Sequence, residues 1–284
     1  MGWNKVVIFL RLIDFEHTLF ALPFAYLGAF LAVGGVPTAH DFWWITAAMV
    51  GARTAALALN RLIDRHIDAR NPRTANWILP RGLIGLPVVY LAIVLSLALL
   101  FIAAAHLNPL CLKLAPAAVF VLVIYSYTKR FTWACHLVLG FAIGLGPVGS
   151  WIAITARFDW PAILLGAAVA LWVAGFDAMY ACQDEEFDRQ EGLYSLPARF
   201  GTARTLQITA GFHLFTVLLL VAVGVTLGLG WLYYMGVGIA AGVLIYEHLL
   251  VSPGDLSKMN TAAFRLNRYV STIIFVFTLV DMFK

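Results

Sequence analysis

Charged residues are scarce in this chain. Only 12% of its 284 residues are Asp, Glu, Lys or Arg, whereas 62% are hydrophobic. An ordinary soluble domain has about 25% charged residues and roughly 45–50% apolar ones. The composition therefore excludes a water-soluble globule, a disordered chain and a conventional nucleic-acid-binding protein, because the apolar surface must face something other than water. The sequence predicts an integral membrane protein.

Cysteine is also sparse. The three cysteines, Cys111, Cys135 and Cys182, stand far apart and form no C-x-x-C pair. Zinc sites and disulfide frameworks need paired or closely spaced cysteines, so neither is expected. Cys182 lies beside an acidic cluster, but we interpret it as a packing residue.

Long apolar runs, by contrast, recur along the whole chain. A helix needs about 20 apolar residues to cross the hydrocarbon core of a bilayer. Nine runs approach that length: Leu19–Gly34, Phe42–Ile63, Leu86–Ala105, Leu114–Tyr127, Cys135–Thr155, Ala162–Ala181, Leu206–Leu227, Trp231–Leu250 and Tyr269–Phe283. They are continuous and lack the alternation of a membrane barrel. We therefore predict an all-α, multi-pass membrane protein with about nine transmembrane helices in one bundle, forming a single domain over residues 1–284.

The few cations are distributed unequally between the two sides of the membrane. The N-terminal segment and the loops after spans 2, 4, 6 and 8 contain 15 of the 19 Lys and Arg residues, whereas the other side contains only Lys113, Arg157 and Lys284. Cytoplasmic loops carry the excess of Lys and Arg. The pattern predicts a cytoplasmic N-terminus and an external C-terminus, in the cytoplasmic (inner) membrane of a bacterium. It also accounts for the net charge of +4 without a nucleic-acid partner.

The acids follow a different pattern, since eight of the fifteen gather in or beside the loops after spans 2 and 6. The first group contains Asn60, Asp64 and Asp68, which a spacing of four places on one helical face. Arg53, seven residues before Asn60, lies on the same stripe. Two carboxylates and an amide oxygen on one face are typical of a Mg²⁺ site.

The second group contains Asp177, Asp184 and Asp188, at helical offsets of seven and four. An alternative is that these acids only solvate helix ends and pair with nearby arginines. Two such motifs on the same side, the first with an Asn in register, favour metal binding in a pocket between them. Asp177 lies within a span, where an ionisable residue is functional by default. The alternative is that Arg53 or Lys129 neutralises it.

Four cations near these acids indicate the ligand. Arg73, Arg81, Lys129 and Arg130 supply the charge and donors that phosphate oxygens require. A diphosphate with an apolar tail suits a site whose walls are apolar and whose mouth is charged. The implied chemistry uses Mg²⁺ as a Lewis acid on a leaving group.

The residues as a set resemble the UbiA superfamily of intramembrane prenyltransferases, over nearly the whole chain. Asn60, Asp64 and Asp68 match its first aspartate-rich motif, Asp184 and Asp188 its second, Tyr125 and Lys129 its Y-x-x-x-K segment, and Arg73 and Thr74 its arginine-threonine loop. The resemblance implies Mg²⁺-dependent transfer of a prenyl group from a polyprenyl diphosphate to an acceptor, often an aromatic ring. It implies that the four aspartates hold two Mg²⁺ ions, that Asn60 completes the first metal's shell, and that Lys129, Tyr125 and Arg73 contact phosphate oxygens. No obligatory protein partner is implied.

The segment 15–25 is similar to the 4-hydroxybenzoate polyprenyltransferases, especially a bacterial subgroup associated with menaquinone made through futalosine. Glu16 and His17 are candidates for reading the acceptor's hydroxyl or carboxylate, alongside Arg53 and Asp177, although an acid at a helix start and an interfacial His are the simpler interpretation. The acceptor, 4-hydroxybenzoate or a dihydroxynaphthoate, stays open at this point.

The chain departs from the family pattern in one loop. Many relatives read R-T-x-x-R-x-x-P, whereas Trp77 stands here in place of the second arginine. We expect either that Arg81 substitutes for that arginine or that the diphosphate is held with one cation fewer.

Three alternatives remain from the sequence. Within the family, haem, chlorophyll and homogentisate acceptors are possible. A secondary transporter or Mg²⁺ carrier would place its acids near the membrane midplane, but most acids here lie at the cytoplasmic ends of the spans. A phospholipid-type CDP-alcohol transferase would carry a D-G-x-x-A-R pattern, which is missing.

Overall fold

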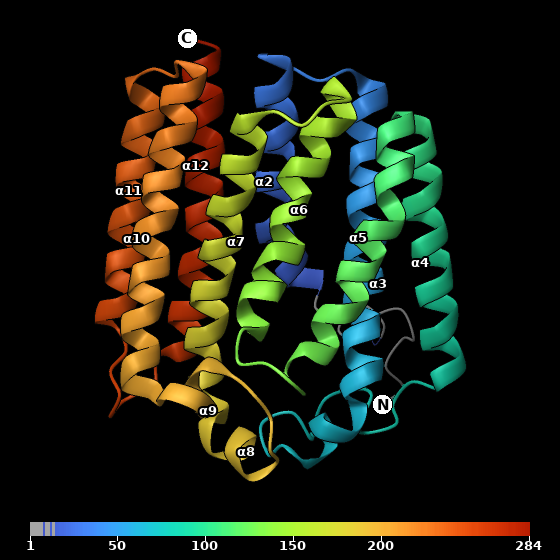
Figure 1. Cartoon of the computed structure of the whole chain (residues 1–284), viewed down its shortest axis with the longest axis vertical. Coiled ribbons are helices and arrows are strands. Elements are labelled where there is room, and N and C mark those ends of the chain that lie inside the picture. The colour runs from blue at the N-terminus through green and yellow to red at the C-terminus, as the bar shows by residue number, and fades with distance from the viewer. Residues whose placement is uncertain (1–7, 9–11, 13–14) are drawn as a thin grey trace.

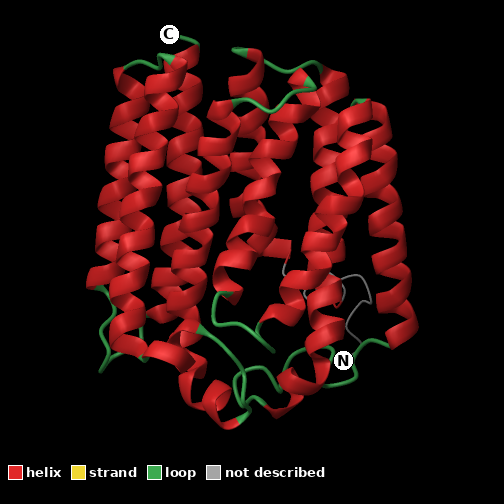
Figure 2. Ribbon diagram, in the orientation of Figure 1, coloured by secondary structure: helices red, strands yellow, loops and turns green. Residues whose placement is uncertain are grey.

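The structure, a computed structural model, describes residues 8, 12 and 15–284, with only the backbone for residues 15–21. Over these residues the chain is almost entirely helical and contains no strand (Figure 2). A single isolated bridge joins Ser252 and Asp255 in the loop before the last helix. The described residues confirm the prediction of an all-α fold.

Nine long helices run side by side along the long axis of the described molecule (Figure 1). They are α2 (Phe15–Val33), α3 (Ala39–Arg70), α4 (Leu86–Leu107), α5 (Pro109–Thr128), α6 (Cys135–Thr155), α7 (Trp160–Ala181), α10 (Thr202–Leu227), α11 (Trp231–Leu249) and α12 (Asn267–Met282). Four short helical elements connect them: η1 (Cys182–Asp184), α8 (Glu185–Gln190), α9 (Leu196–Phe200) and the π-helical turn η2 (Thr261–Leu266). Helix α3 packs against α4, α6 against α7, α7 against α10, and α11 against α12.

Eight of the helical stretches in the described part are long and apolar enough to cross a membrane, and the apolar segment Leu22–Val33 of α2 is shorter. The protein is therefore a multi-pass membrane protein. Each predicted span coincides with a helix, and eight of these helices are confirmed as long and apolar enough to cross a membrane. Several spans were predicted too short. The prediction ended the second span at Ile63, whereas α3 continues to Arg70, because the polar residues of the first acidic group extend the helix beyond its apolar part. The last span was expected to start at Tyr269, but the helical turns begin at Thr261.

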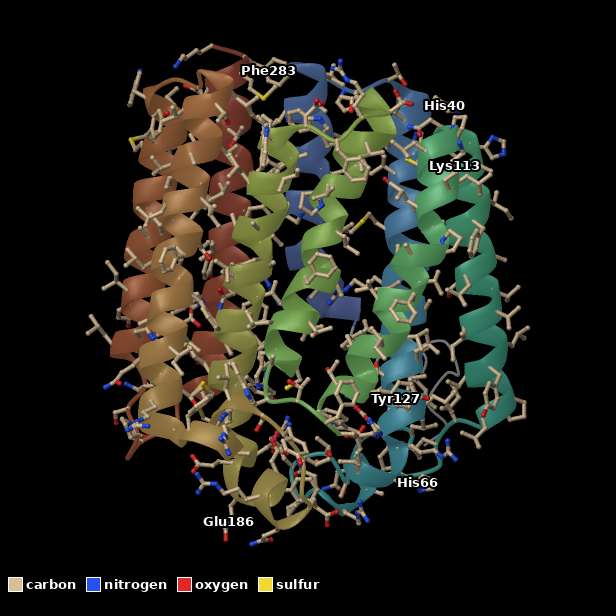
Figure 3. The ribbon with its side chains drawn as sticks, in the orientation of Figure 1. His40, His66, Lys113, Tyr127, Glu186 and Phe283 are labelled. Carbon is tan, nitrogen blue, oxygen red and sulfur yellow. The ribbon has the colours of Figure 1, made fainter. Side chains whose placement is uncertain are left out.

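The two ends of the bundle differ in character. His66 and Glu186 lie at the end where α3 and α8 meet, whereas His40, Lys113 and Phe283 lie at the opposite end (Figure 3). The C-terminus of the chain is at that opposite end (Figure 1). Both acidic groups predicted from the sequence therefore belong to one end of the bundle.

Small residues allow α6 and α7 to approach each other closely. A Cβ atom added to Gly140 would lie 2.1 Å from the backbone oxygen of Ala170, and one added to Gly144 would lie 2.5 Å from the backbone oxygen of Gly166. Glycine-mediated approach of this kind is common between membrane helices, where van der Waals packing replaces the hydrophobic effect as the driving force. This close contact fixes the register between α6, which carries His136, and α7, which carries Asp177.

The half of the bundle made by α7 and α10–α12 has a buried polar core. The Trp172 indole donates to Asn267 Oδ1 at 2.5 Å, and Asn267 Nδ2 donates to Glu247 Oε2 at 3.1 Å. His248 Nε2 lies 3.0 Å from His213 Nδ1. These contacts tie four helices together on the side of α7 away from α6, so the two faces of α7 have different partners.

The packing predicts the effect of a larger residue at Gly140. Gly140→Ala should force α6 from α7 and destabilise the protein by about 1–3 kcal/mol, which lowers the melting temperature in detergent by several degrees. The control is Gly211→Ala in α10, where an added Cβ meets no atom within 4 Å. Equal melting temperatures for the two variants would contradict this account of the α6–α7 contact.

Candidate active site

One cavity of about 530 Å³ lies among α3, α4, α5, α6 and α7. Its far end reaches Leu107 and Ala153, at the ends of α4 and α6, and its walls there are mainly Ala, Leu, Ile and Gly. Its near end reaches the segment after α3 and the start of α8, where both acidic groups line it. The cavity therefore has an apolar interior and a charged mouth.

Asp64 is the most heavily paired acid at the mouth. Its side chain is buried, Lys129 Nζ lies 2.7 Å from Oδ2, and Arg130 Nη2 lies 2.9 Å from Oδ1. Asn60 Nδ2 also donates to Oδ2 at 3.0 Å. A buried carboxylate requires such compensation because desolvation of an ion is costly. Two cations from the end of α5 thus neutralise the central residue of the first acidic group.

Asp68 has a different environment. It is buried, and its Oδ2 has no hydrogen-bond partner. Thr74 Oγ1 donates to the Asp68 backbone oxygen at 2.8 Å, which fixes the segment after α3 against the helix end. Lys129, Arg61 and Arg73 act on this carboxylate only through longer-range electrostatics. An orphaned buried carboxylate oxygen calls for a ligand of its own.

Asp184 links the second acidic group to the segment that follows the first. Arg73 Nε donates to Oδ1 at 2.9 Å, Arg73 Nη2 also binds Oδ2, and Asn71 Nδ2 donates to Oδ1 at 2.9 Å. Arg73 Nη1 donates to the Tyr180 hydroxyl at 2.9 Å. Burial opposes the charged guanidinium, but the hydrogen bonds and the charge of Asp184 outweigh it and hold the pKa of Arg73 above its ordinary value. The bidentate pair joins the segment after α3 to η1, at the end of α7, across the mouth.

Asp188 lies on α8, one turn beyond Asp184. Its Oδ2 accepts from Ser195 Oγ at 2.7 Å. The expected run of Asp177, Asp184 and Asp188 on one continuous helical face is interrupted, because the 3-10 turn η1 separates α7 from α8. All three nevertheless line the cavity.

The segment containing Trp77 leaves Arg81 outside the cavity. Arg81 is exposed and does not line the cavity, because the loop turns away after Pro80. The guanidinium carbon of Arg61 lies 3.7 Å from the centre of the Trp77 ring, and both residues line the cavity. Arg61, held by a cation–π contact, is therefore the extra cation at the mouth. No sequence pattern paired these two residues, since 16 positions separate them.

The other predicted phosphate ligands divide into two sets. Tyr125 lines the cavity, and its hydroxyl donates to the Ala56 backbone oxygen at 3.4 Å. Arg130 does not line the cavity, since its guanidinium is bound to Asp64 and to the backbone oxygens of Ser126 and Ile63. In this structure Arg130 supports Asp64 from the side away from the cavity.

Of the four candidate acceptor residues, two line the cavity and two have side chains that the structure does not describe. Arg53 and Asp177 line the cavity, deeper than the other members of the two acidic groups. Glu16 and His17 belong to the backbone of α2, and their side chains lie outside the described residues. Neither Arg53 nor Lys129 neutralises Asp177: its Oδ2 lies 2.7 Å from Nδ1 of His136 on α6. Sequence reasoning missed His136, because a single His in an apolar helix belongs to no pattern.

The charges that line the cavity nearly balance. They are Asp64, Asp68, Asp177, Asp184 and Asp188 against Arg53, Arg61, Arg73 and Lys129. With His136 neutral, the cavity carries a formal charge of −1. It can therefore take up an anion only together with additional cations.

The carboxylate oxygens at the mouth suit a hard divalent cation, although they are not gathered around a single point. In the described part of the chain, no group of three or more His, Cys, Asp or Glu side chains lies close enough to hold a metal ion. The reason is that Lys129 and Arg73 already occupy Asp64 and Asp184. Four carboxylates line this mouth, and one of them, Asp68, has an oxygen without a partner. Carboxylate oxygens are the donors that Mg²⁺ prefers.

Comparison with known proteins identifies the class to which this site belongs. The UbiA prenyltransferase family matches residues 21–269, which is most of the chain. The protein therefore belongs to the UbiA prenyltransferase family and is a transferase of polyprenyl groups. The family match decides between an enzyme and a transporter in favour of the enzyme.

Particular relatives agree with this assignment. A 4-hydroxybenzoate octaprenyltransferase of Aliivibrio salmonicida is 32% identical over 248 residues, covering 87% of this chain and 86% of the relative. The apo structure of a UbiA homologue from Aeropyrum pernix has a TM-score of 0.85 and 34% identity, covering 94% of this chain and 98% of that one. A UbiA homologue from Archaeoglobus fulgidus bound to DMAPP and Mg²⁺ has a TM-score of 0.63 and 21% identity, with coverage of 94% and 98%.

The Arg73–Asp184 pair predicts how the segment 71–85 is held. Arg73→Gln should release this segment from α7, because it removes the ionic, bidentate contact to Asp184. We expect amide hydrogen exchange across residues 71–80 to rise by about tenfold or more. Arg81→Gln, in the same segment but exposed, is the matched control. Unchanged exchange in the Arg73 variant would show that other contacts hold the segment.

Proposed function

We propose that the protein transfers the prenyl group of a polyprenyl diphosphate to a ring carbon of an aromatic acid, with Mg²⁺ as cofactor. The acceptor class is 4-hydroxybenzoate or a dihydroxynaphthoate, as in ubiquinone or menaquinone biosynthesis. The observation that carries the proposal is one cavity with an apolar interior and a mouth lined by four aspartates and three cations. An amphipathic substrate with a diphosphate head and a hydrocarbon tail matches both parts.

Charge balance supports the metal. A prenyl diphosphate carries a charge of about −3, and the cavity residues sum to −1 with His136 neutral. Burying this much negative charge at the edge of a low-dielectric interior is prohibitive without cations. Two Mg²⁺ ions bring the sum to about zero. The Archaeoglobus fulgidus homologue, solved with DMAPP and Mg²⁺, supports the same ligand pair.

Different side chains at the mouth have different roles. Asp64, Asp68, Asp184 and Asp188 would hold Mg²⁺ with help from Asn60, and bound Mg²⁺ would supply the positive charge that stabilises the leaving diphosphate. Lys129 and Arg73 now neutralise Asp64 and Asp184. When the substrate arrives, these two cations would turn from carboxylate to phosphate oxygens. Arg61 and Tyr125, which line the same cavity, would add further donors. Arg130 stays behind Asp64 and keeps that carboxylate in place.

The acceptor binds deeper in the cavity. Arg53 supplies a fixed positive charge for the acceptor's carboxylate. The apolar walls exclude water from the allylic cation that forms when the diphosphate leaves. The curated relative from Aliivibrio salmonicida, named for 4-hydroxybenzoate, supports a hydroxylated aromatic acid as acceptor.

The orientation in the membrane follows from the cations. We place the end with α3, α8 and the mouth on the cytoplasmic side, because the Lys-rich and Arg-rich loops lie there. Water-soluble diphosphate is then released into the cytoplasm, and the prenylated product stays in the bilayer. The C-terminus, at the opposite end of the bundle, would be outside.

The direct test incubates purified protein with labelled prenyl diphosphates and a panel containing 4-hydroxybenzoate, dihydroxynaphthoate and homogentisate, with and without Mg²⁺. We expect one prenylated aromatic acid, formed only with Mg²⁺, and a loss of at least about 100-fold in Asp64→Asn and Asp184→Asn. Asp255→Asn, an exposed acid in a loop away from the cavity, should retain full activity.

Two outcomes would overturn the proposal. Formation of no prenylated aromatic from any acceptor would reject the reaction. Full activity in the Asp64 and Asp184 variants would reject the assigned residues. A homogentisate product alone would keep the reaction but replace the acceptor.

A further inference from the structure

His136 is placed where the proposed reaction needs a group that no assigned residue supplies. It lies on α6, its side chain is 5% exposed, and it lines the cavity with Asp177. Three buried polar side-chain atoms in the described part of the chain lack a hydrogen-bond partner: Asp68 Oδ2, His136 Nε2 and Glu247 Oε1. Asp68 belongs to the mouth and Glu247 does not line the cavity. The imidazole nitrogen of His136, in the first turn of α6, is therefore an unused polar atom where the charged mouth passes into the apolar interior of the cavity.

The contact with Asp177 sets the hydrogen-bonding role of that nitrogen. A carboxylate only accepts hydrogen bonds, so the 2.7 Å contact places the hydrogen on Nδ1 of His136. We take the imidazole as neutral in the enzyme that binds the acceptor, so that Nε2 presents a lone pair. A buried lone pair without a donor costs about 1–3 kcal/mol. The group that satisfies it is a donor such as a hydroxyl.

The depth of the pair suits the ring of the acceptor. Asp177 precedes Asp184 by seven residues, which at 1.5 Å per residue is about 10 Å along α7. The diphosphate would sit at Asp184, and the carbon it leaves lies one layer deeper, beside the attacking ring. Leu139, Val173 and Phe176 line the cavity around the pair, so the surroundings are apolar.

We propose that His136, oriented by Asp177, accepts a hydrogen bond from the ring hydroxyl of the aromatic acceptor and thereby selects hydroxylated acceptors. Asp177 is a positioning residue, because it acts by fixing the tautomer and the ring plane of His136. The inference rests on the proposed function, since it presupposes an aromatic acceptor in this cavity. It adds the recognition of the hydroxyl, complementary to the recognition of the carboxylate by Arg53.

The test measures binding, so it is independent of catalytic rate. The full-length purified protein, with Mg²⁺ and inorganic diphosphate present, is titrated with the acceptor that supports transfer and with its methyl ether, which lacks the donor. The wild type should bind the hydroxyl compound about tenfold more tightly than the ether. His136→Phe should reduce this preference to about twofold or less. His136→Gln, whose amide oxygen also accepts a hydrogen bond, should retain part of it.

Asp177→Asn gives a result that a purely structural role would not produce. The Asn amide can donate to Nδ1, which moves the hydrogen to Nε2 and turns it from acceptor to donor. The preference for the hydroxyl compound should then disappear or reverse, although the side chains keep their size. His40→Gln, at an exposed position at the far end of α3, is the matched control and should behave as wild type.

The failure of this inference is distinct from the failure of the proposed function. If the wild type forms a prenylated aromatic acid but the His136→Phe and Asp177→Asn variants keep the full preference for the hydroxyl, the inference is wrong and the reaction stands. If His136→Phe does not fold, the Asp177→Asn result decides alone. If the wild type forms no prenylated aromatic acid, the proposed function fails first.

Discussion

The structure depends on the compensation of charge at the edge of an apolar interior. Asp64 is buried between Lys129 and Arg130, and Asp184 is bound by Arg73. Removing one partner from a buried ion pair costs about 3–5 kcal/mol, because the remaining charge is left without compensation. These pairs connect α3 to α5 and the segment after α3 to α7. The same contacts that close the mouth structurally are those that a metal and a diphosphate would replace.

The need for charge compensation explains why the carboxylates are paired with protein cations although they are the expected metal ligands. An unpaired set of five aspartates in this cavity would be strongly destabilised, so the fold supplies four Lys and Arg residues. The compensation is nearly complete but leaves one oxygen of Asp68 without a partner. Under the proposed function, Mg²⁺ would take the place of the protein cations at the carboxylates, and those protein cations would pair with phosphate oxygens. Such an exchange would limit the net charge buried at the mouth.

Much of the fold and the mouth follows from local patterns in the sequence. The apolar runs predicted the helices, and the spacing of Asn60, Asp64 and Asp68 predicted one helical face, because periodicity along a single helix is visible in the sequence. Contacts between helices are not visible in this way. The pairing of His136 with Asp177 joins α6 to α7, and the stacking of Arg61 on Trp77 joins a helix to a loop. The exposed position of Arg81 was not visible for the same reason, since the turn after Pro80 decides which way the loop faces.

The central claim is that the metal and the prenyl diphosphate bind together, by exchange with the protein's own cations. The measurement is the affinity of the purified protein for a non-hydrolysable prenyl thiodiphosphate over a range of Mg²⁺ concentrations, with EDTA as the zero point. The account predicts at least about 100-fold tighter binding at saturating Mg²⁺, and an equal factor in the overall constant for binding both Mg²⁺ ions when the analogue is present, as linkage requires. An affinity for the analogue that is the same in EDTA as in Mg²⁺ would contradict it.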